Sequence, residues 1–230
     1  MQNLSFVSPG AIRGVALDMD GLLFDTESLY WKVGDAVLQR RGFRFGDALQ
    51  QQMMGRVGLD AMSVMIQCHD LDDDAQTLLD ESNDLYAQLL QGGVNAMPGL
   101  DVFLAKLRRS NLPYGVATSS QKRFAHTILR SHDLIEELQF IITGDDVVQG
   151  KPHPEIYQSA ARAMGIPVES MLVLEDSQLG ARAAVSSGAA TVAIPNQNTM
   201  QHRFDAVRGI AESLSDPRLL HSLPQADISP

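Results

Sequence analysis

The sequence has little cysteine and no long apolar run, and both absences exclude classes of protein. Cys68 is the only cysteine among 230 residues, so an intrachain disulfide and a cysteine-ligated metal cluster are both excluded. No run of about 18 apolar residues is present, and the N-terminus lacks the basic and then apolar segments of a signal peptide. We therefore expect a cytoplasmic protein without a membrane partner, and Cys68 packed in a core.

Positive charge is also scarce. The chain has 18 Lys and Arg residues against 28 Asp and Glu residues, which gives a formal net charge of −10. A nucleic-acid-binding surface requires a basic patch, so we expect no nucleic-acid partner. The apolar content of 44% is sufficient for one large core or two smaller ones. No signal for a particular oligomer is present, and a monomer is the simplest expectation.

Five short apolar runs predict the strands of a parallel sheet. They are Gly14–Asp18, Tyr114–Thr118, Phe140–Gly144, Met171–Asp176 and Ala190–Ile194. The runs are continuous rather than alternating, as in strands that are buried on both faces. Helical patterns separate them, and one of these helices is expected to end at Gly188. This alternation predicts an α/β fold with a Rossmann-like parallel sheet.

One interval is too long for a simple crossover. About 90 residues separate the first two strands, whereas a crossover needs about a dozen. Their pattern is helical, so we interpret 25–95 as an inserted helical cap domain with hinges at its ends. A rigid helical excursion packed on the sheet is the alternative. The Rossmann-like core would then be discontinuous, formed by 1–24 and 96–224, and 225–230 would be a loose tail.

Polar residues follow the predicted strands where a parallel sheet gathers its ligands. They are Asp18 and Asp20 after the first strand, Thr118, Ser119 and Ser120 after the second, Lys151 after the third, and Glu175 and Asp176 at the end of the fourth. The carboxyl ends of parallel strands meet at one edge of the sheet, so these groups should lie close together. Carboxylates, hydroxyls and a lysine at one edge are typical of phosphate and magnesium chemistry.

Each of these residue types has a physical reason to be there. Mg²⁺ prefers one or two carboxylates together with waters and phosphate oxygens, and Asp18, Asp176 and the backbone carbonyl of Asp20 would serve. A carboxylate nucleophile is repelled by a phosphate dianion, and the metal and Lys151 would offset that repulsion. The hydroxyl of Thr118 can hold phosphoryl oxygens.

The residues after Thr118 have two readings. The amide of Ser119, near a helix N-terminus, can hold a phosphoryl oxygen. The side chains of Ser119 and Ser120 are also plausible N-caps for the helix that follows.

Two acids at positions i and i+2 permit a division of labour. Asp18 would attack phosphorus to form an aspartyl-phosphate. Asp20 would protonate the leaving alkoxide and then deprotonate the water that hydrolyses the intermediate. Taken singly, each of these strand-end motifs is more simply a turn or a helix cap. The occurrence of all of them in order, each at a strand end, favours the catalytic interpretation.

The motifs DMDGLLFDTE, ATSS, GKPHPE and LEDSQLGARAAVSSGA resemble the four motifs of the haloacid dehalogenase superfamily of phosphohydrolases. The resemblance covers Val15 to Ile194 and is strongest to the β-phosphoglucomutase-like branch, which includes sugar-phosphate and pseudouridine-monophosphate phosphatases. It implies a Rossmann-like core with a small helical cap. It also implies that Asp18, Asp20, Thr118 and Lys151 are catalytic, and that Glu175 joins Asp176 on the metal side.

The same resemblance directs attention to the cap. The segment MMGRVGLD resembles a cap loop that reaches the site, so Gly55 and Arg56 are candidate substrate-binding residues together with Ser119. An ordinary surface arginine is the alternative reading of Arg56. Mutases of this branch tend to have a histidine where this chain has Tyr30.

We therefore expect a Mg²⁺-dependent phosphatase of a small phosphorylated metabolite, such as a sugar phosphate or a nucleotide-like monoester. A phosphohexomutase that uses the same phospho-aspartate is the alternative. A non-enzymatic phospho-acceptor module is a more remote one, because it needs neither Asp20 nor a long helical insertion.

Overall fold

The computed structural model describes residues 5–53, 56 and 58–224, and its chain divides into two compact units. The first unit consists of residues 1–24 and 96–230, and the second of residues 25–95. The proposed tail at 225–230 lies outside the described residues. Within the described part of the chain, no helix is both long enough and apolar enough to cross a membrane.

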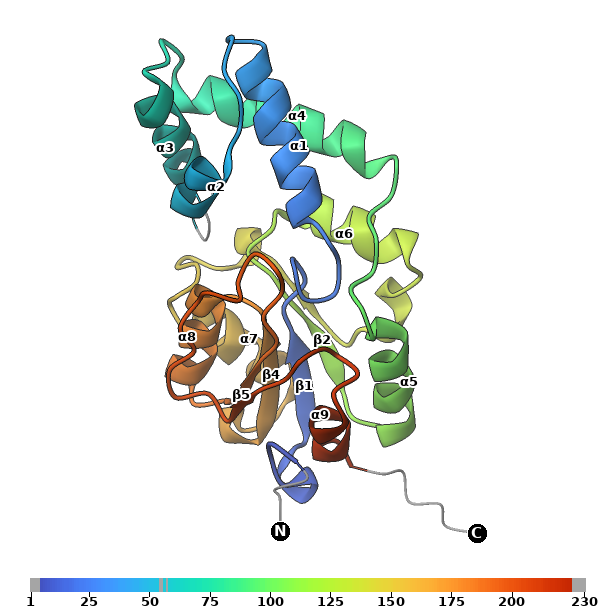
Figure 1. Ribbon diagram of the computed structural model, residues 1–230. Coiled ribbons are helices and arrows are strands. Elements are labelled where there is room, and N and C mark those ends of the chain that lie inside the picture. The colour runs from blue at the N-terminus through green and yellow to red at the C-terminus, as the bar shows by residue number, and fades with distance from the viewer. Residues whose placement is uncertain (1–4, 54–55, 57, 225–230) are drawn as a thin grey trace. The chain divides into compact units, whose positions relative to one another are not determined.

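A parallel sheet forms the centre of the first unit (Figure 1). Among the described residues it has six strands in the order β3-β2-β1-β4-β5-β6. The strands are β1 (Gly14–Leu17), β2 (Tyr114–Ala117), β3 (Ile141–Ile142), β4 (Met171–Glu175), β5 (Ala190–Ala193) and β6 (Gly209–Ile210). Every adjacent pair is parallel, with Leu17 of β1 opposite Val116 of β2 and Leu174 of β4. The predicted fold class is therefore confirmed.

The strands form where the sequence has its apolar runs, but they end earlier than those runs. All residues of β1, β2, β4 and β5 are buried, as expected for strands covered on both faces. Asp18, Thr118 and Asp176 each lie one residue beyond the end of a strand. The last strand, β6, was not predicted, because its two residues do not belong to an apolar run in the sequence.

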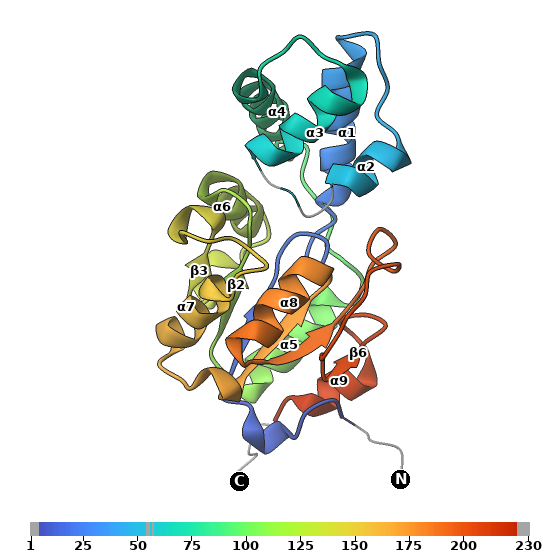
Figure 2. The ribbon, with the colours of Figure 1, turned by 90° about the vertical axis from the view of Figure 1, so that its left-hand side faces the viewer.

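Helices cover both faces of this sheet. α7 (Glu155–Met164) and α8 (Gln178–Ser187) pack on one face, and α5 (Leu100–Ser110) lies on the other (Figures 1 and 2). Small side chains let α8 approach closely, and Gly188 ends it in the left-handed conformation, as predicted. The remaining elements are α6 (Lys122–Ser131), α9 (Pro217–Ser222) and the short 3₁₀ helices η1 (Pro9–Ala11), η2 (Ile135–Glu137), η3 (Gly144–Asp146) and η4 (Val168–Ser170).

The predicted serine cap of α6 is wrong. The N-cap of this helix is Gln121, which makes no capping hydrogen bond through its side chain. The Ser120 hydroxyl instead donates to Asp20, 100 residues earlier in the chain. Ser120 therefore makes a hydrogen bond to a distant residue of the site and not a capping bond to the start of α6.

The second unit consists of helices. They are α1 (Glu27–Gln39), α2 (Asp47–Met53), α3 (Leu59–His69) and α4 (Ala75–Leu90). α1 packs on α4, and Arg41 connects this pair to the α3–α4 loop by donating to Asp73 and Glu81 over 2.7 and 2.8 Å. Cys68 is exposed on α3, so the prediction of a core cysteine is wrong.

Candidate active site

The strand order places the candidate site at the centre of the sheet edge. β1 lies between β2 and β4, so the residues that follow these three strands meet at their carboxyl ends. In open α/β sheets this edge, at the point where the strand order reverses, is where ligands bind. Asp18, Thr118 and Asp176 occupy it.

A tight turn directs Asp20 back to the same edge. Gly21 has a φ of +75°, a conformation that favours glycine, and its amide donates to the carbonyl of Phe24. The amides of Leu23 and Phe24 both donate to the carbonyl of Met19. The turn thus folds closely on itself immediately after β1, and Asp20 lies next to the end of β2.

The Asp20 carboxylate is held on one side only. Its Oδ2 accepts hydrogen bonds from the hydroxyls of Thr118 at 2.7 Å and Ser120 at 2.8 Å. Its Oδ1 is buried and has no hydrogen-bond partner in the described part of the chain. The two hydroxyls therefore fix the orientation of a carboxylate that keeps one oxygen available.

Lys151 is a buried cation between two acids. Its ammonium donates to Asp18 Oδ1 at 2.5 Å, to Glu175 Oε1 at 2.7 Å and to the carbonyl of Ala117 at 3.1 Å. Its side chain is only 7% exposed. Burial alone would lower the pKa of Lys151, but Asp18 and Glu175 raise it well above its ordinary value, so the amine is charged.

Glu175 is saturated with hydrogen bonds. Its Oε1 accepts from Lys151 and from the buried phenol of Tyr157, and its Oε2 accepts from the amide and hydroxyl of Ser177. A Cβ added at Gly180 would overlap Oε1, so the carboxylate occupies space that only glycine leaves free in α8. These contacts make Glu175 an anchor for Lys151.

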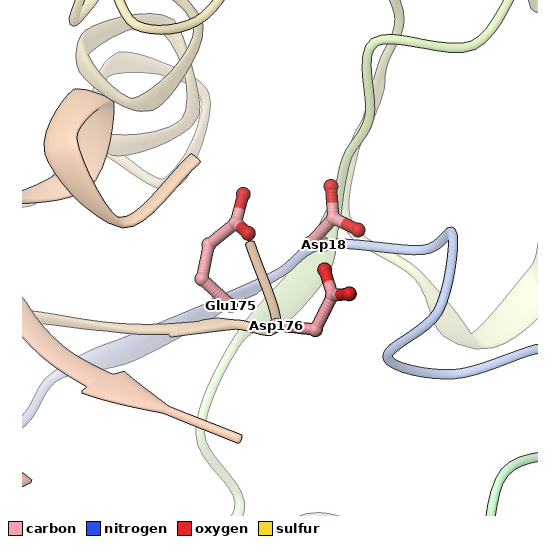
Figure 3. A group of neighbouring side chains, drawn as sticks. All are labelled: Asp18, Glu175 and Asp176. Atoms are coloured by element: carbon pink, nitrogen blue, oxygen red, sulfur yellow. The ribbon is translucent and has the colours of Figure 1, made fainter. Parts of the chain in front are cut away.

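Three buried acids form a cluster that fits a metal ion. One oxygen from each of Asp18, Glu175 and Asp176 lies within 4.8 Å of the others (Figure 3). Burial, followed by the neighbouring charges of Glu175 and Asp20, raises the pKa of Asp18 well above its usual value, although Lys151 opposes this. Buried carboxylates in excess of the nearby cations are costly, and a divalent cation with a preference for oxygen ligands would offset that cost.

Asp176 has a partner from the loop that follows β5. The side-chain amide of Asn196 donates to Asp176 Oδ2 at 2.9 Å and to the carbonyl of Gly21 at 3.0 Å. A Cβ on Gly21 would lie 2.7 Å from both the amide nitrogen and the carboxylate oxygen. Asn196 therefore joins the end of β4 to the turn that carries Asp20.

The candidate residues predicted from the sequence fall into two groups. Asp18, Asp20, Thr118, Lys151, Glu175 and Asp176 are brought together at one edge, and Ser119 lies beside Thr118 on the following loop. In the helical unit, Arg56 is exposed, and its Nε donates to the carbonyl of Gln52. Gly55 lies outside the described residues.

Tyr157 and Asn196 were not proposed as site residues from the sequence, and Ser120 was grouped with the strand-end residues but assigned only a possible role as a helix cap. Asn196 follows a predicted strand, so its position gave a signal that could have been used. Tyr157 gave none, because it lies on the apolar face of α7 and looks like a core residue.

Comparisons with known proteins agree with this geometry. Residues 15–194 match the family model described as haloacid dehalogenase-like hydrolase. The chain is 32% identical over 215 residues to (DL)-glycerol-3-phosphatase 2 of Arabidopsis thaliana, covering 90% of this chain and 89% of that protein. It is 29% identical over 205 residues to the probable pseudouridine-5'-phosphatase of Drosophila melanogaster, covering 86% and 88%.

A solved structure has the same fold. The CbbY protein of Rhodobacter sphaeroides in complex with phosphate superposes with a TM-score of 0.82 at 23% identity, covering 92% of this chain and 99% of that one. The family match extends over well more than half of the chain, and the predicted recognition is confirmed. The chain belongs to the haloacid dehalogenase-like hydrolase family.

Proposed function

We propose that this protein is a Mg²⁺-dependent phosphatase that hydrolyses a small phosphorylated metabolite through an aspartyl-phosphate on Asp18. The observation that carries the proposal is the position of the Asp18 carboxylate. It contacts the Lys151 ammonium at one oxygen and belongs to the buried acid cluster. The relatives named as glycerol-3-phosphatase and pseudouridine-5'-phosphatase support the same reaction class.

In the first step, a carboxylate oxygen of Asp18 attacks phosphorus. The new bond joins Asp18 to the phosphoryl group, and the bond between phosphorus and the leaving oxygen breaks. Asp20 in its acid form gives its proton to that oxygen, which leaves as an alcohol. Lys151 holds Asp18 in place and reduces the repulsion between the carboxylate and the phosphate dianion.

In the second step, Asp20 acts as a base. It takes a proton from a water molecule, whose oxygen attacks phosphorus while the bond to Asp18 breaks. Inorganic phosphate leaves, and Asp20 is again protonated. The hydroxyls of Thr118 and Ser120 fix the orientation of Asp20 for both proton transfers, and the Ser119 amide is proposed to hold a phosphoryl oxygen.

Asp18, Asp176 and the backbone carbonyl of Asp20 would hold the metal, with Glu175 on the same side. When bound, Mg²⁺ would supply positive charge that neutralises the phosphoryl oxygens. Since both oxygens of Glu175 already accept two hydrogen bonds each, its main contribution is to fix Lys151.

The helical unit is proposed to be a cap domain that excludes water and selects the leaving group. Arg56, and Gly55 beside it, are the proposed substrate contacts. Tyr30 of α1 stacks on Tyr86 of α4 with ring centroids 4.6 Å apart. An aromatic pair is therefore found where a mutase of this branch has a histidine, and this favours hydrolysis over phosphohexomutase activity.

A phosphate-release screen tests the proposed function. The panel contains p-nitrophenyl phosphate, glycerol 3-phosphate, hexose phosphates and nucleoside 5'-phosphates, each assayed with Mg²⁺ and with EDTA. We expect metal-dependent release with wild type. Asp20→Asn should lower kcat for the alkyl phosphates by about 10²–10⁴-fold, the usual contribution of a general acid or base. Phosphate release that persists in EDTA would contradict the metal requirement.

The p-nitrophenyl ester adds a control within the same screen. Its leaving group needs no protonation, so Asp20→Asn should slow only the second step for this substrate. A faster conversion of hexose 1-phosphate to 6-phosphate than to inorganic phosphate would favour the mutase alternative.

We further propose that the protein is a cytoplasmic monomer. The single cysteine, which excludes an intrachain disulfide, supports the cytoplasmic location, and the monomer is the simplest oligomeric state for this sequence. Light scattering of the purified protein tests its oligomeric state, and fractionation of the source cells tests its location.

A further inference from the structure

The side-chain orientation of Asn196 is determined by its surroundings. Its Oδ1 accepts hydrogen bonds from the backbone amides of Asn198 at 2.8 Å and Thr199 at 3.3 Å. Its Nδ2 faces two acceptors, Asp176 Oδ2 and the carbonyl of Gly21. Exchanging the oxygen and nitrogen would place acceptor against acceptor and donor against donor, so only this orientation satisfies all four contacts.

The loop that carries Asn196 is itself fixed. The amide of Asn196 donates to the hydroxyl of Thr199 at 2.9 Å, and the amide of Thr199 donates to the carbonyl of Asn196 at 3.1 Å. Thr199 is buried. The side chain of Asn196 therefore extends from a turn whose backbone is held by hydrogen bonds to Thr199.

Asn196 contacts both halves of the proposed metal site. One hydrogen bond reaches the carboxylate of Asp176 after β4, and the other reaches the residue next to Asp20 after β1. A Cβ at Gly21 would lie 2.7 Å from both the Asn196 amide nitrogen and the Asp176 carboxylate, so only glycine leaves room for these contacts. The side-chain amide of Asn196 thus bridges Asp176 and the Asp20 turn.

We propose that Asn196 is a positioning residue that sets the metal affinity and the metal selectivity of this site. It has no contact with the reacting atoms and acts through Asp176 and the Gly21 carbonyl. Groups that orient metal ligands in this way typically contribute 10–100-fold to metal affinity. The inference rests on the proposed metal dependence of the enzyme.

The expected selectivity between Mg²⁺ and Ca²⁺ follows from their different coordination geometries. Mg²⁺ requires near-ideal octahedral geometry at short distances, whereas Ca²⁺ accepts longer distances and more variable ligand arrangements. Loss of the amide that fixes Asp176 should therefore weaken Mg²⁺ binding more than Ca²⁺ binding.

The test measures metal binding directly. Mn²⁺ is titrated into the metal-free full-length protein, free Mn²⁺ is quantified by electron paramagnetic resonance, and Mg²⁺ and Ca²⁺ are then used to displace it. We expect Asn196→Ala to raise the Kd for Mg²⁺ by about 10–100-fold. The ratio of the Mg²⁺ Kd to the Ca²⁺ Kd should also rise.

Two further variants separate positioning from general destabilisation. Gln197→Ala changes an exposed neighbour and should leave metal affinity unchanged. Tyr114→Phe removes a phenol that donates to Glu137 at 2.7 Å, outside the acid cluster. It should lower the unfolding temperature in EDTA without changing the Mg²⁺ affinity.

The outcomes are distinct. Equal Mg²⁺ affinities for wild type and Asn196→Ala, or equal losses of affinity in Asn196→Ala and Tyr114→Phe, would overturn the positioning role and leave the proposed metal site intact. Failure of the wild type to bind Mn²⁺ or Mg²⁺ would overturn the proposed metal dependence as well.

Discussion

The phenol of Tyr157 donates a hydrogen bond of 2.7 Å to Oε1 of Glu175, and both side chains are fully buried. The same carboxylate oxygen accepts from Lys151, which in turn donates to Asp18. Burial, and then the charge of Glu175, raises the pKa of Tyr157 well above its ordinary value, so the phenol remains a donor. A residue of α7, which packs on one face of the sheet, thereby fixes the cation beside the proposed nucleophile.

Replacing Tyr157 with Phe should loosen that arrangement without changing any group that touches substrate. One hydrogen bond to a charged group is lost, which should cost roughly 1.5–3 kcal/mol of stability. We expect kcat to fall while KM changes little, since Lys151 is less well oriented when Asp18 attacks.

Tyr114 provides the matched control. Its phenol also donates to a carboxylate, that of Glu137, at 2.7 Å, but this pair is not part of the acid cluster. Tyr114→Phe should affect stability and not kcat. Similar kcat values for the two Phe variants would contradict the positioning role of Tyr157.

Lys151→Met should destabilise the fold as well as abolish activity. Removing the cation leaves Asp18 and Glu175 as buried carboxylates without their partner, a change that typically costs about 3–5 kcal/mol. Urea denaturation measures this loss. The double variant Lys151→Met, Glu175→Gln should be less destabilised than the sum of the two single variants, and strict additivity of the losses would show that the pair does not interact.

Gly180→Ala should impair the enzyme even though alanine favours helices. The new methyl group would overlap the Glu175 carboxylate and displace it from Lys151. Overpacking of this kind costs about 1–3 kcal/mol. Gly46→Ala, where no atom lies within 4 Å of the added Cβ, is the control and should retain activity and stability. Full activity in Gly180→Ala would contradict the tight fit of Glu175.

Asp216 should make the fold sensitive to acid. Its carboxylate accepts from the guanidinium and amide of Arg218 and from the amide of Glu212, and these contacts lower its pKa from 3.8 to about 2. Since the folded pKa lies below the unfolded one, the stabilisation is complete above about pH 4 and is lost as the pH falls toward 2.

One pKa unit corresponds to about 1.4 kcal/mol, so this contribution is at most about 2.5 kcal/mol, and exposure of Arg218 reduces it. Asp216→Asn should lower stability at pH 7 and flatten its dependence on pH between 4 and 2. Thermal unfolding over this range measures the difference. Parallel stability curves for the variant and wild type would contradict the assignment.

The sheet and most of the site could be predicted from the sequence because their signals are local. β1, β2, β4 and β5 are apolar runs, and Asp18, Thr118 and Asp176 are the polar residues that follow them. Parallel topology alone then brings these side chains to one edge.

The contacts that fix the site could not be predicted in the same way. Asn196 contacts Gly21, 175 positions away in the sequence, and Ser120 contacts Asp20 from 100 positions away. Local rules assigned Ser120 to a helix cap, because a serine before a helix usually is one. The apolar pattern of α7 indicates that Tyr157 is a core residue, and its ring is indeed buried. The pattern gives no information about the hydrogen bond from its hydroxyl to Glu175.

The most direct test of the account is identification of the phosphorylated residue. Enzyme mixed with substrate and Mg²⁺ is quenched in acid, and the peptide that contains Asp18 is analysed by mass spectrometry. We predict that this peptide gains the mass of one phosphoryl group in wild type and accumulates more of it in Asp20→Asn with p-nitrophenyl phosphate, because hydrolysis of the intermediate is slowed. Phosphate release by wild type with no modification of Asp18 in either protein would contradict the central claim.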